Sequence, residues 1–424
     1  MQAANNPSGP ALIRINIIIF KGDKVADMRK PLEGVRVLDL TQAYSGPFCT
    51  MNLADLGAEV IKIERPGVGD QTRTWGPFKN DYSAYFAYVN RNKEGVTLNM
   101  KDDEGKEIFA DMIKHADVVV ENYKVGTLGK LGFDYETMKE INPGIIYANI
   151  SGYGLEGPLA SRPAYDIVAQ GMSGMMSVTG YPDAPPTKIG PSIGDNYSGA
   201  YLCIGILAAL YRKQQTGEGA RIDVSMVDTL FSVMENFVVK YTVAGEHPMR
   251  AGNIDPGIAP FDSFHAKDAE FCMGCGTDKM FHKLCDIMER PDLKEDPRFA
   301  TNDLRCINYL PDLKAEIEKF TTTKTVKELE EMIADEGIPF GPINDIPTIA
   351  DSELIASRNM LWEAYQPGMD ATIKFPGCPI KIHGLKDAPE KASPTLGEDN
   401  KKVYESLLGY DEAKLAELEE KGII

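Results

Sequence analysis

The chain has 424 residues, of which 43% are hydrophobic and 25% are charged, and its formal net charge is −18. So much negative charge repels nucleic-acid phosphates and anionic membranes, so we expect neither as a partner. The length exceeds that of one ordinary domain and predicts two lobes. Seven cysteines, an odd number scattered through apolar segments, indicate reduced thiols and a cytoplasmic protein. No apolar stretch approaches the roughly 20 residues of a membrane span.

The first predicted elements form a strand–helix–strand unit. An apolar run at 35–40 predicts a buried strand, and residues 58–64 predict the next one. Between them, residues 46–57 have helical spacing and end on Gly57, a favoured helix terminator. Further elements alternate in the same way: helices near 103–115, near 134–141, from about 166 and from about 196 to 215, and strands at 117–122 and 144–151. This alternation predicts an α/β fold with a doubly wound, mostly parallel sheet of the nucleotide-binding kind.

Beyond residue 225 the alternation stops. A strand and two helical stretches follow, in what we predict to be a smaller α+β lobe. A linker and two amphipathic helices come after it, and we expect them to return to the first lobe. The predicted segments are an N-terminal extension at 1–28 (not a signal peptide), a large α/β domain at 29–225, a small domain at 226–335, and the linker with its terminal helices at 336–424.

Loops that contain glycine follow the predicted strands. Ligands of an open parallel sheet bind beyond the carboxyl ends of its strands, so we expect the site where loops begin at Thr41, Arg65 and Asn122. A dinucleotide is the obvious ligand, but the first turn offers only Gly46 followed by Pro47 in place of G-x-G-x-x-G. Proline also lacks the backbone N–H that would face a pyrophosphate. The sequence therefore argues against a nicotinamide-dependent oxidoreductase.

Several ordered blocks resemble a known family. They include LDLTQAYSGPFCTMNLADLGAEVIKIERPGVGD, NRNKEGVTLNMKDDEG, LGFDYETMKEINPGIIYANISGYG and IGDNYSGAYLCIGILAALYRKQQTGEG. From about Pro31 to its C-terminus the chain is similar to the class III (CaiB/BaiF-type) CoA-transferases, which include formyl-CoA:oxalate CoA-transferase. The resemblance implies that the large domain binds CoA and that two subunits form an interlocked, ring-like homodimer with the site at their boundary. It also implies acyl-CoA and a small carboxylic acid as substrates, with no metal and no tightly bound cofactor.

Asp195 lies in the Gly-Asp step before the long apolar helix. In the family this aspartate is the nucleophile, and the resemblance implies that Asp195 forms a mixed anhydride with the acyl group and then an aspartyl-CoA thioester. Small neighbours such as Gly194 would let a bulky thioester approach. Considered by residue chemistry alone, Asp195 is better explained as a helix N-cap, a position that favours aspartate, and only the surrounding blocks favour the nucleophile.

Three residues after the first strand match the place where the family gathers the thioester and the acid. They are Gln42, Tyr44 and Ser45, of which Gln42 and Tyr44 are candidate donors to a carbonyl oxygen in catalysis. Hydrogen bonding within the loop is the alternative for them. Trp75 and Tyr85 match aromatic residues that border the acid pocket in the oxalate enzyme, although aromatic residues more often belong to the core.

The resemblance also implies a set of CoA contacts. The matching positions are Ala43, Ser45, Arg65, Leu98, Asn122, Tyr123 and Lys130. Arg65 and Lys130 would face the phosphates, because a 3′-phosphate and a pyrophosphate need cations. Solvated surface cations are the alternative for these two, and a plain core leucine is the alternative for Leu98.

Two other functions remain open for a protein with this fold. α-Methylacyl-CoA racemases resemble the transferases but carry a histidine before the aspartate that opens the next helix; here Tyr165 stands before Asp166, so the base for neutral pH is missing. This favours a transferase. For Asp166 we favour a helix-capping role over a hydrogen bond to a loop near the nucleophile. A CoA-binding protein without catalysis is the further alternative.

A cluster of cysteines and one histidine superficially suggests zinc. The residues are Cys272, Cys275, His282 and Cys285. Cys272 and Cys275 fall on one predicted strand, where residues i and i+3 point to opposite faces. We therefore interpret them as buried thiols and expect no metal.

Overall fold

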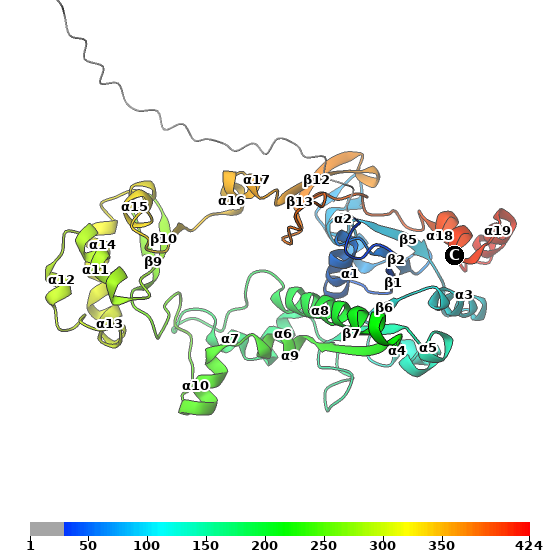
Figure 1. The fold of residues 1–424 in the computed structure, drawn as a ribbon, viewed down its shortest axis with the longest axis horizontal. Coiled ribbons are helices and arrows are strands. Elements are labelled where there is room, and N and C mark those ends of the chain that lie inside the picture. Colours follow the sequence, from blue (N-terminus) through cyan, green and yellow to red (C-terminus); the bar gives the residue numbers. More distant parts are fainter. Residues whose placement is uncertain (1–28) are drawn as a thin grey trace, which may run out of the picture.

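The computed structural model describes residues 29–424, so the predicted extension at 1–28 lies outside the described residues. Figure 1 shows a large lobe, a small lobe and two separate connections between them, which give the chain the outline of an open ring. One connection runs through α7 (Met175–Val178) and α10 (Asn236–Ala244), and the other through α16 (Ile346–Ala350) and α17 (Glu353–Ser357). No helix within 29–424 is long and apolar enough to cross a membrane.

Six parallel strands form the sheet of the large lobe. Their spatial order is β5-β2-β1-β6-β7-β8. Their bounds are β1 Arg36–Asp39, β2 Glu59–Glu64, β5 Lys93–Thr97, β6 Val118–Glu121, β7 Ile146–Ser151 and β8 Ala220–Ser225. This topology confirms the predicted doubly wound α/β fold. The order of strands reverses between β1 and β6, so the crevice beyond the carboxyl ends of these two strands is the expected ligand site.

Two strands of this sheet escaped sequence analysis. β5 reads KEGVT, a composition that does not indicate a strand. Its lysine, Lys93, can be buried inside the lobe because it forms an ion pair there. β8 reads ARIDVS and lies at the edge of the sheet, where alternate side chains face solvent. Neither strand carries the continuous apolar run that identified its neighbours.

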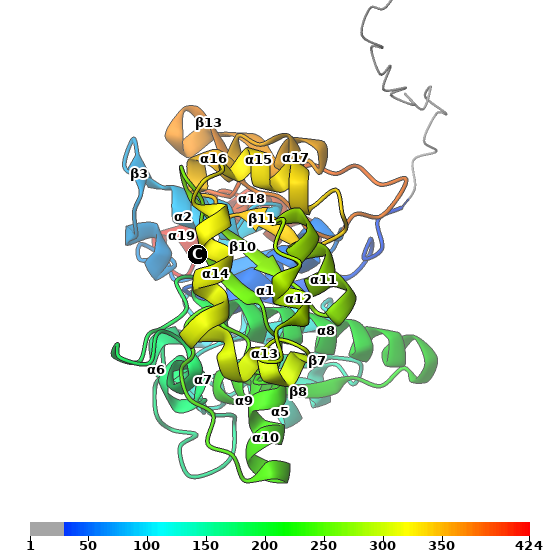
Figure 2. The ribbon, with the colours of Figure 1, turned by 90° about the vertical axis from the view of Figure 1, so that its left-hand side faces the viewer.

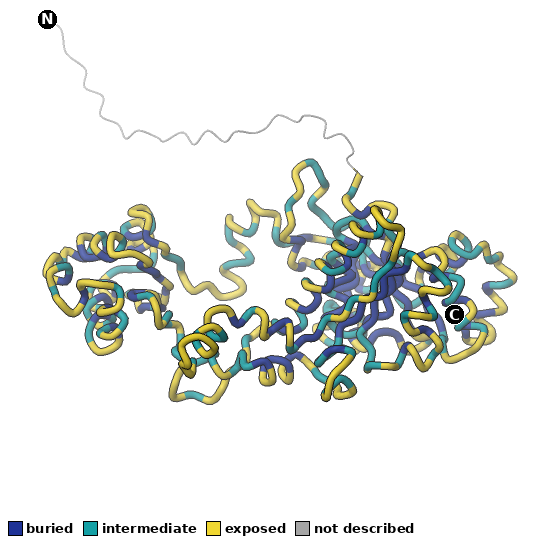
Figure 3. Tube along the Cα trace, turned by 60° about the horizontal axis from the view of Figure 1, so that its bottom comes forward, coloured by how far each residue is buried: buried dark blue, intermediate teal, exposed yellow. Residues whose placement is uncertain are grey.

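Helices cover both faces of the sheet. One face packs against α1 (Ser45–Asp55), α6 (Asp166–Met172), α8 (Ile193–Thr216) and α9 (Met226–Ser232). The other packs against α3 (Asp103–Lys114), α5 (Tyr135–Ile141), α18 (Asn400–Leu408) and α19 (Glu412–Glu420). The last two come from the C-terminal segment, so the end of the chain completes the core of the first lobe. Buried residues are concentrated in this lobe (Figure 3).

The starts of α1 and α8 approach each other closely. A Cβ atom on Gly199 would lie 2.6 Å from the backbone oxygen of Ser45, so only glycine fits at this crossing. Gly199 therefore brings the first turn of α8 beside the first turn of α1, which follows β1. The two segments that contain Asp195 and Tyr44 become neighbours for this reason.

The small lobe has its own sheet and core. Its antiparallel strands are β9 Phe261–His265, β10 Glu270–Gly274 and β11 Phe340–Pro342. Its helices are α11 Asp278–Ile287, α12 Asp292–Glu295, α13 Asn302–Asn308, α14 Lys314–Thr321 and α15 Val326–Ile333, which lie in front in Figure 2. The hydrophobic core of this lobe runs from Ala259 to Ile338, whereas Met226 and Leu230 of α9 pack in the large lobe.

Shorter elements frame the carboxyl edge of the large sheet. They are the 3-10 helix Gln71–Thr74, β3 Phe78–Lys79, β4 Tyr82–Ser83, α2 Ala84–Val89 and α4 Thr127–Lys130. An antiparallel hairpin of β12 (Leu361–Gln366) and β13 (Ala371–Pro376) lies in the segment that we interpreted as a linker. Its Trp362 and Phe375 pack against Tyr88 of α2, which anchors the returning chain.

Candidate active site

A pocket of about 320 Å³ lies beyond the carboxyl ends of β1, β6 and β7. The predicted site residues that line it are Gln42, Ala43, Ser45, Asn122, Tyr123 and Asp195. The connection from β1 into α1, the loop after β6 and the start of α8 contribute them, so the fold brings together residues up to 153 positions apart, from 42 to 195. A larger hollow of about 900 Å³ surrounds Glu59, at the opposite end of β2, and contains no predicted site residue. The candidate site is therefore the pocket beyond β1, β6 and β7, which we call the switch-point pocket because the strand order reverses there.

Asp195 is the third residue of α8, in its first turn. Ser192 occupies the N-cap, so the helix begins earlier than we expected and the capping interpretation of Asp195 is wrong. The carboxylate is half-buried, and no residue within the described part of the chain donates a hydrogen bond to it. Burial raises its pKa from 3.8 to about 7, and the negative charge of Asp166 adds to the effect. Asp195 thus has a desolvated carboxylate with free lone pairs.

Asp166 supports the start of α8 from the neighbouring helix. One carboxylate oxygen accepts the backbone N–H of Gly194 at 2.8 Å, and the other accepts the side-chain amide of Gln170 at 2.7 Å. Gln170 in turn accepts the N–H of Ile189 at 2.8 Å. Tyr165, not Asp166, is the N-cap of α6, so the capping role that we favoured is wrong. The bond that Asp166 makes beside Asp195 goes to Gly194 in the first turn of α8, and not to a loop as the alternative had it.

The loop after β1 is bound to the loop after β6. The N–H of Gln42 donates to the side-chain oxygen of Asn122 at 2.8 Å, and the amide of Asn122 donates to the carbonyl of Gln42 at 2.7 Å. These reciprocal bonds fix the two loops across the point where the strand order reverses. The side chain of Asn122 is therefore occupied by the protein, although the residue lines the pocket.

Aromatic residues lie beside Asp195. The rings of Tyr44 and Tyr85 are 5.6 Å apart, and those of Tyr85 and Trp75 are 5.7 Å apart. Burial, followed by the neighbouring Tyr88 and smaller contributions from Tyr85 and Asp195, raises the pKa of Tyr44 well above its usual range. Burial and the charge of Asp195 raise the pKa of Tyr85 to about 12. Both phenols are therefore protonated at neutral pH and can act as hydrogen-bond donors.

The structure does not bring the remaining predicted residues into this pocket. Tyr44 is close enough to Asp195 to feel its charge but does not line the pocket. Arg65 and Lys130 are exposed, the first after β2 and the second at the end of α4. Leu98 is 3% exposed and packs in the core between the sheet and α3, which matches the structural alternative for it. Lys124 also lines the pocket, as its place after the predicted strand with Asn122 and Tyr123 indicated, and so does Arg162, which the sequence did not indicate. Arg162 follows no strand directly, so its position in a long loop gave no signal.

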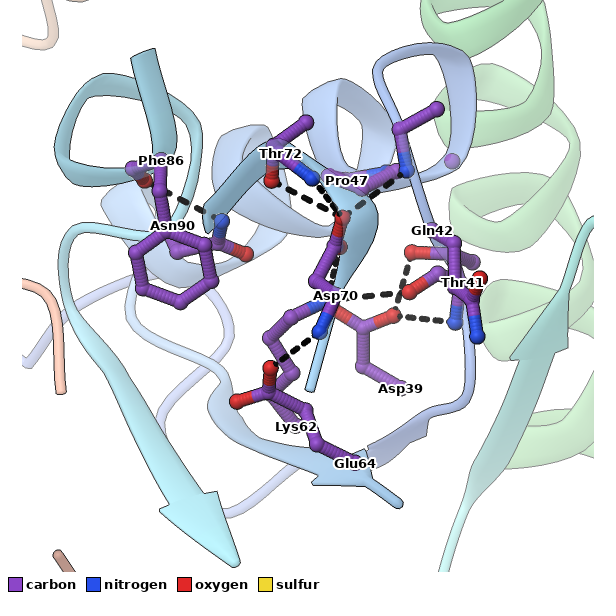
Figure 4. A network of polar contacts seen from close by, with 12 residues as sticks. Asp39, Thr41, Gln42, Pro47, Lys62, Glu64, Asp70, Thr72, Phe86 and Asn90 are labelled. Atoms are coloured by element: carbon purple, nitrogen blue, oxygen red, sulfur yellow. Dashed lines mark hydrogen bonds and ion pairs between the residues drawn. The ribbon is translucent and has the colours of Figure 1, made fainter. Parts of the chain in front are cut away.

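A cluster of four buried charges, which the sequence had not led us to expect, lies beneath the loop after β1; Figure 4 labels three of them, Asp39, Lys62 and Asp70. Its members are Asp39, Lys62, Asp70 and Lys93, none of them more than 1% exposed. A signal existed, because Lys62 interrupts the apolar strand EVIKIE. A lysine facing the core of a parallel sheet needs a buried partner.

The cysteines of the small lobe divide by exposure. Cys272 is exposed, so its interpretation as a buried thiol is wrong, whereas Cys275 and Cys285 are buried in the hydrophobic core. The strand β10 ends at Gly274, so Cys275 follows it and does not lie on it as predicted. Across residues 29–424 there is no group of three or more potential metal ligands.

Comparisons with known proteins define the class of the protein and then its family. Acetyl-CoA:oxalate CoA-transferase of Acetobacter aceti is 43% identical over 375 residues, which cover 88% of this chain and 95% of that protein. Succinyl-CoA:mesaconate CoA-transferase of Haloarcula marismortui is 40% identical over 376 residues, covering 87% and 94%. The crystal structure of a CaiB/BaiF family protein from Brucella suis matches with a TM-score of 0.79 and 37% identity, covering 90% of this chain and 100% of that one. The protein is a CoA-transferase.

More particularly, the sequence model of CoA-transferase family III matches residues 32–400. The chain belongs to this family, which confirms the resemblance that its sequence blocks indicated.

Proposed function

We propose that this CoA-transferase moves CoA from an acyl-CoA donor to a small organic acid through covalent intermediates on Asp195. The observation that carries the proposal is the half-buried carboxylate at the switch-point pocket, to which no described residue donates a hydrogen bond. A carboxylate needs no general base to act as a nucleophile once it is ionised. Its lone pairs are free, and it lines a pocket of about 320 Å³.

The proposed reaction balances without ATP or a proton source. The Asp195 oxygen attacks the thioester carbonyl, the C–S bond breaks, and CoA leaves as a thiolate. The thiolate attacks the aspartyl carbonyl of the resulting mixed anhydride, releasing the donor acid and forming the aspartyl-CoA thioester. The incoming carboxylate attacks the aspartyl carbonyl of this thioester, which forms a second mixed anhydride and releases CoA as a thiolate. The thiolate then attacks the acceptor's acyl carbon, which gives the new acyl-CoA and regenerates the Asp195 carboxylate. One thioester replaces another of similar energy.

Neighbouring groups have roles in this scheme. Tyr44 and the side chain of Gln42 are the proposed donors to the oxyanion that forms at each carbonyl, because preorganised donors lower such barriers. Ala43, Ser45 and Tyr123 line the path of the pantetheine arm. Arg65 and Lys130 are proposed to bind the CoA phosphates from outside the pocket, and Asn122 to hold the two loops together.

The acceptor is proposed to be a small dicarboxylic acid. The relatives' names identify oxalate and mesaconate as acceptors, and a mouse relative, 37% identical over 399 residues, is a succinyl-CoA:glutarate CoA-transferase. All three acids carry two carboxylates. Lys124 and Arg162 supply positive charge on the pocket wall for the carboxylate that does not react.

We also propose that the active form is an interlocked homodimer. Exposed apolar side chains gather on α6, α8 and α10, where Ile167, Ile204 and Val243 are 55%, 60% and 81% exposed. α10 buries none of its own residues in the single chain. Apolar surface on this scale favours a partner, and the open ring of Figure 1 leaves room for a second chain to pass through.

The test is a panel of acyl-CoA donors against mono- and dicarboxylic acids, with hydroxylamine added to trap the activated aspartyl group. We expect CoA exchange with dicarboxylates, a hydroxamate at Asp195, and loss of exchange in Asp195→Asn. Trapping at another residue would contradict the mechanism. Exchange of the α-hydrogen of an acyl-CoA for deuterium without transfer would indicate a racemase, and CoA binding without either reaction would indicate a non-catalytic protein.

A further inference from the structure

Four charged side chains lie buried directly beneath the loop that faces Asp195. They are Asp39 of β1, Lys62 of β2, Lys93 of β5 and Asp70, which precedes the 3-10 helix. Figure 4 labels Asp39, Lys62 and Asp70. Burying a charge is costly unless it is paired and hydrogen-bonded. Here two negative and two positive groups balance: Lys62 pairs with Asp70 at 2.9 Å, and Lys93 pairs with Asp39 at 3.0 Å.

These charges hold the backbone of the loop from Thr41 to Ala43. The N–H of Thr41 donates to Asp39 at 2.9 Å, and the ammonium group of Lys62 donates to the carbonyl of Thr41 at 2.9 Å. The N–H of Ala43 donates to Asp70 at 3.2 Å. Because the loop is not part of the sheet, buried side chains supply partners for its backbone that a strand would otherwise supply.

Ala43 has an unusual conformation that this arrangement explains. Its φ is +63°, in the left-handed region, which costs free energy for any residue with a Cβ atom. Such conformations persist where the surroundings over-determine them, and they cluster at functional sites. The residues on either side of Ala43 are Gln42 and Tyr44, the two proposed oxyanion donors, so the φ of Ala43 sets the direction of both.

Asp70 is the connecting point. Besides Ala43, it accepts the N–H and the hydroxyl of Thr72, both at 2.8 Å, and its own N–H donates to Glu64 at 2.7 Å. It therefore fixes the loop after β1 relative to the loop after β2. Asp70 itself does not line the switch-point pocket.

We infer that Asp70, held by its ion pair with Lys62, is a positioning residue for the transfer reaction: it keeps Ala43 in the left-handed conformation and thereby aims Gln42 and Tyr44 at the reacting carbonyl beside Asp195. This inference rests on the proposed function, because it gives those two side chains their target.

A purely structural role for Asp70 is the competing explanation, and the chain provides a matched control. Asp55, at the far end of α1, is also buried, with 1% of its side chain exposed. It accepts two bonds from Arg91, at 3.1 and 2.7 Å, and one from Asn92 at 2.7 Å. Removing either carboxylate leaves a buried cation without its partner, but only Asp70 contacts the loop after β1.

The experiment compares Asp70→Ala with Asp55→Ala in the full-length enzyme, each with and without Ala43→Gly. Melting temperature, kcat and KM for acyl-CoA are measured for all four proteins and the wild type. We expect Asp70→Ala to lower kcat by about 10- to 100-fold, well beyond the loss in Asp55→Ala at a comparable drop in melting temperature. Ala43→Gly should restore kcat of Asp70→Ala at least severalfold, because glycine adopts a positive φ without steric cost. It should give Asp55→Ala no such gain.

Equal losses of kcat in the two single variants, or no rescue by Ala43→Gly, would overturn the inference. Should either alanine variant fail to fold, Asp70→Asn and Asp55→Asn replace them. The Asp70→Asn side chain keeps an acceptor for the N–H of Ala43 and loses only the charge, so a kcat no lower than that of Asp55→Asn would overturn the role of the ion pair. The proposed function is judged separately, by wild-type exchange and by trapping at Asp195, so it survives a failure of this inference.

Discussion

Replacing Asp195 by asparagine should stabilise the folded protein while abolishing transfer. In the folded state burial and Asp166 raise the pKa of Asp195 from 3.8 to about 7. A raised pKa means that the folded state binds this proton more tightly than the unfolded state, so ionisation opposes folding. The penalty begins as pH rises past 3.8, grows up to about 7 and is constant above that.

The size of the effect follows from the shift. At about 1.4 kcal/mol per pKa unit, a rise from 3.8 to about 7 costs up to about 4 kcal/mol at pH 8 and less than 2 kcal/mol at pH 5. Asparagine does not titrate and carries no such penalty. We therefore expect Asp195→Asn to raise the free energy of unfolding by up to about 4 kcal/mol at pH 8, and by clearly less at pH 5.

Guanidinium unfolding and melting curves at pH 5 and pH 8 measure this difference. Asp228→Asn is the matched control, because Asp228 is also the third residue of a helix, α9, but is exposed. Because Asp228→Asn removes a negative charge from a helix start, it should lower the free energy of unfolding by up to about 1 kcal/mol at either pH. If Asp195→Asn behaves like Asp228→Asn, or its effect does not depend on pH, the carboxylate is not desolvated and the reasoning fails.

Three further predictions concern the same site. Asp166→Asn removes the neighbouring charge that raises the pKa of Asp195, so the acidic limb of the kcat/KM profile, expected near pH 7, should move to lower pH; an unchanged limb would contradict the assignment. Gly199→Ala places a Cβ 2.6 Å from the Ser45 carbonyl oxygen, and we expect it to lower the free energy of unfolding by about 1–3 kcal/mol and to lower kcat. Gly276→Ala is the control: its Cβ would meet nothing within 4 Å, so neither quantity should change appreciably. Arg65→Ala should raise KM for acyl-CoA about tenfold at low salt, and by less at high salt, with kcat retained; Arg29→Ala, another exposed arginine, is its control.

The parts of the fold that the sequence predicted are those whose signal is local. β1, β2, β6 and β7 are apolar runs because parallel strands are buried on both faces, and most helices show regular spacing. β5 was invisible because its stability depends on pairing with β2 and on the ion pair of Lys93 with Asp39. Both are contacts that no local window contains.

The site, too, has features that the sequence predicted and features that it did not. Its place beyond the strand ends followed from the topology of α/β sheets, and the residue blocks indicated the family. The actual start of α8 did not follow, because Ser192 and Asp195 are both favourable caps and only the backbone decides between them. Likewise, the bond from Gly194 to Asp166 joins residues 28 positions apart and depends on how α6 packs against α8.

Buried carboxylates elsewhere in the large lobe make Asp195 exceptional. Asp39 accepts bonds from Thr41, Thr50 and Lys93, and Glu64 accepts two from Arg73. For Asp39, burial alone would raise the pKa, but Lys93 and Lys62 outweigh it and lower the pKa below its usual range. The fold therefore has ample means to satisfy a carboxylate that it buries.

At Asp195 the surroundings do the opposite. The charged neighbour that shifts the pKa of Asp195 is another carboxylate, Asp166, whose own oxygens already accept bonds from Gly194 and Gln170. A structural carboxylate would gain stability from a donor at this position, whereas a nucleophile would lose reactivity to it, because a hydrogen bond occupies the lone pair that must attack. The contrast within one lobe thus favours chemistry over folding as the reason for an aspartate at residue 195.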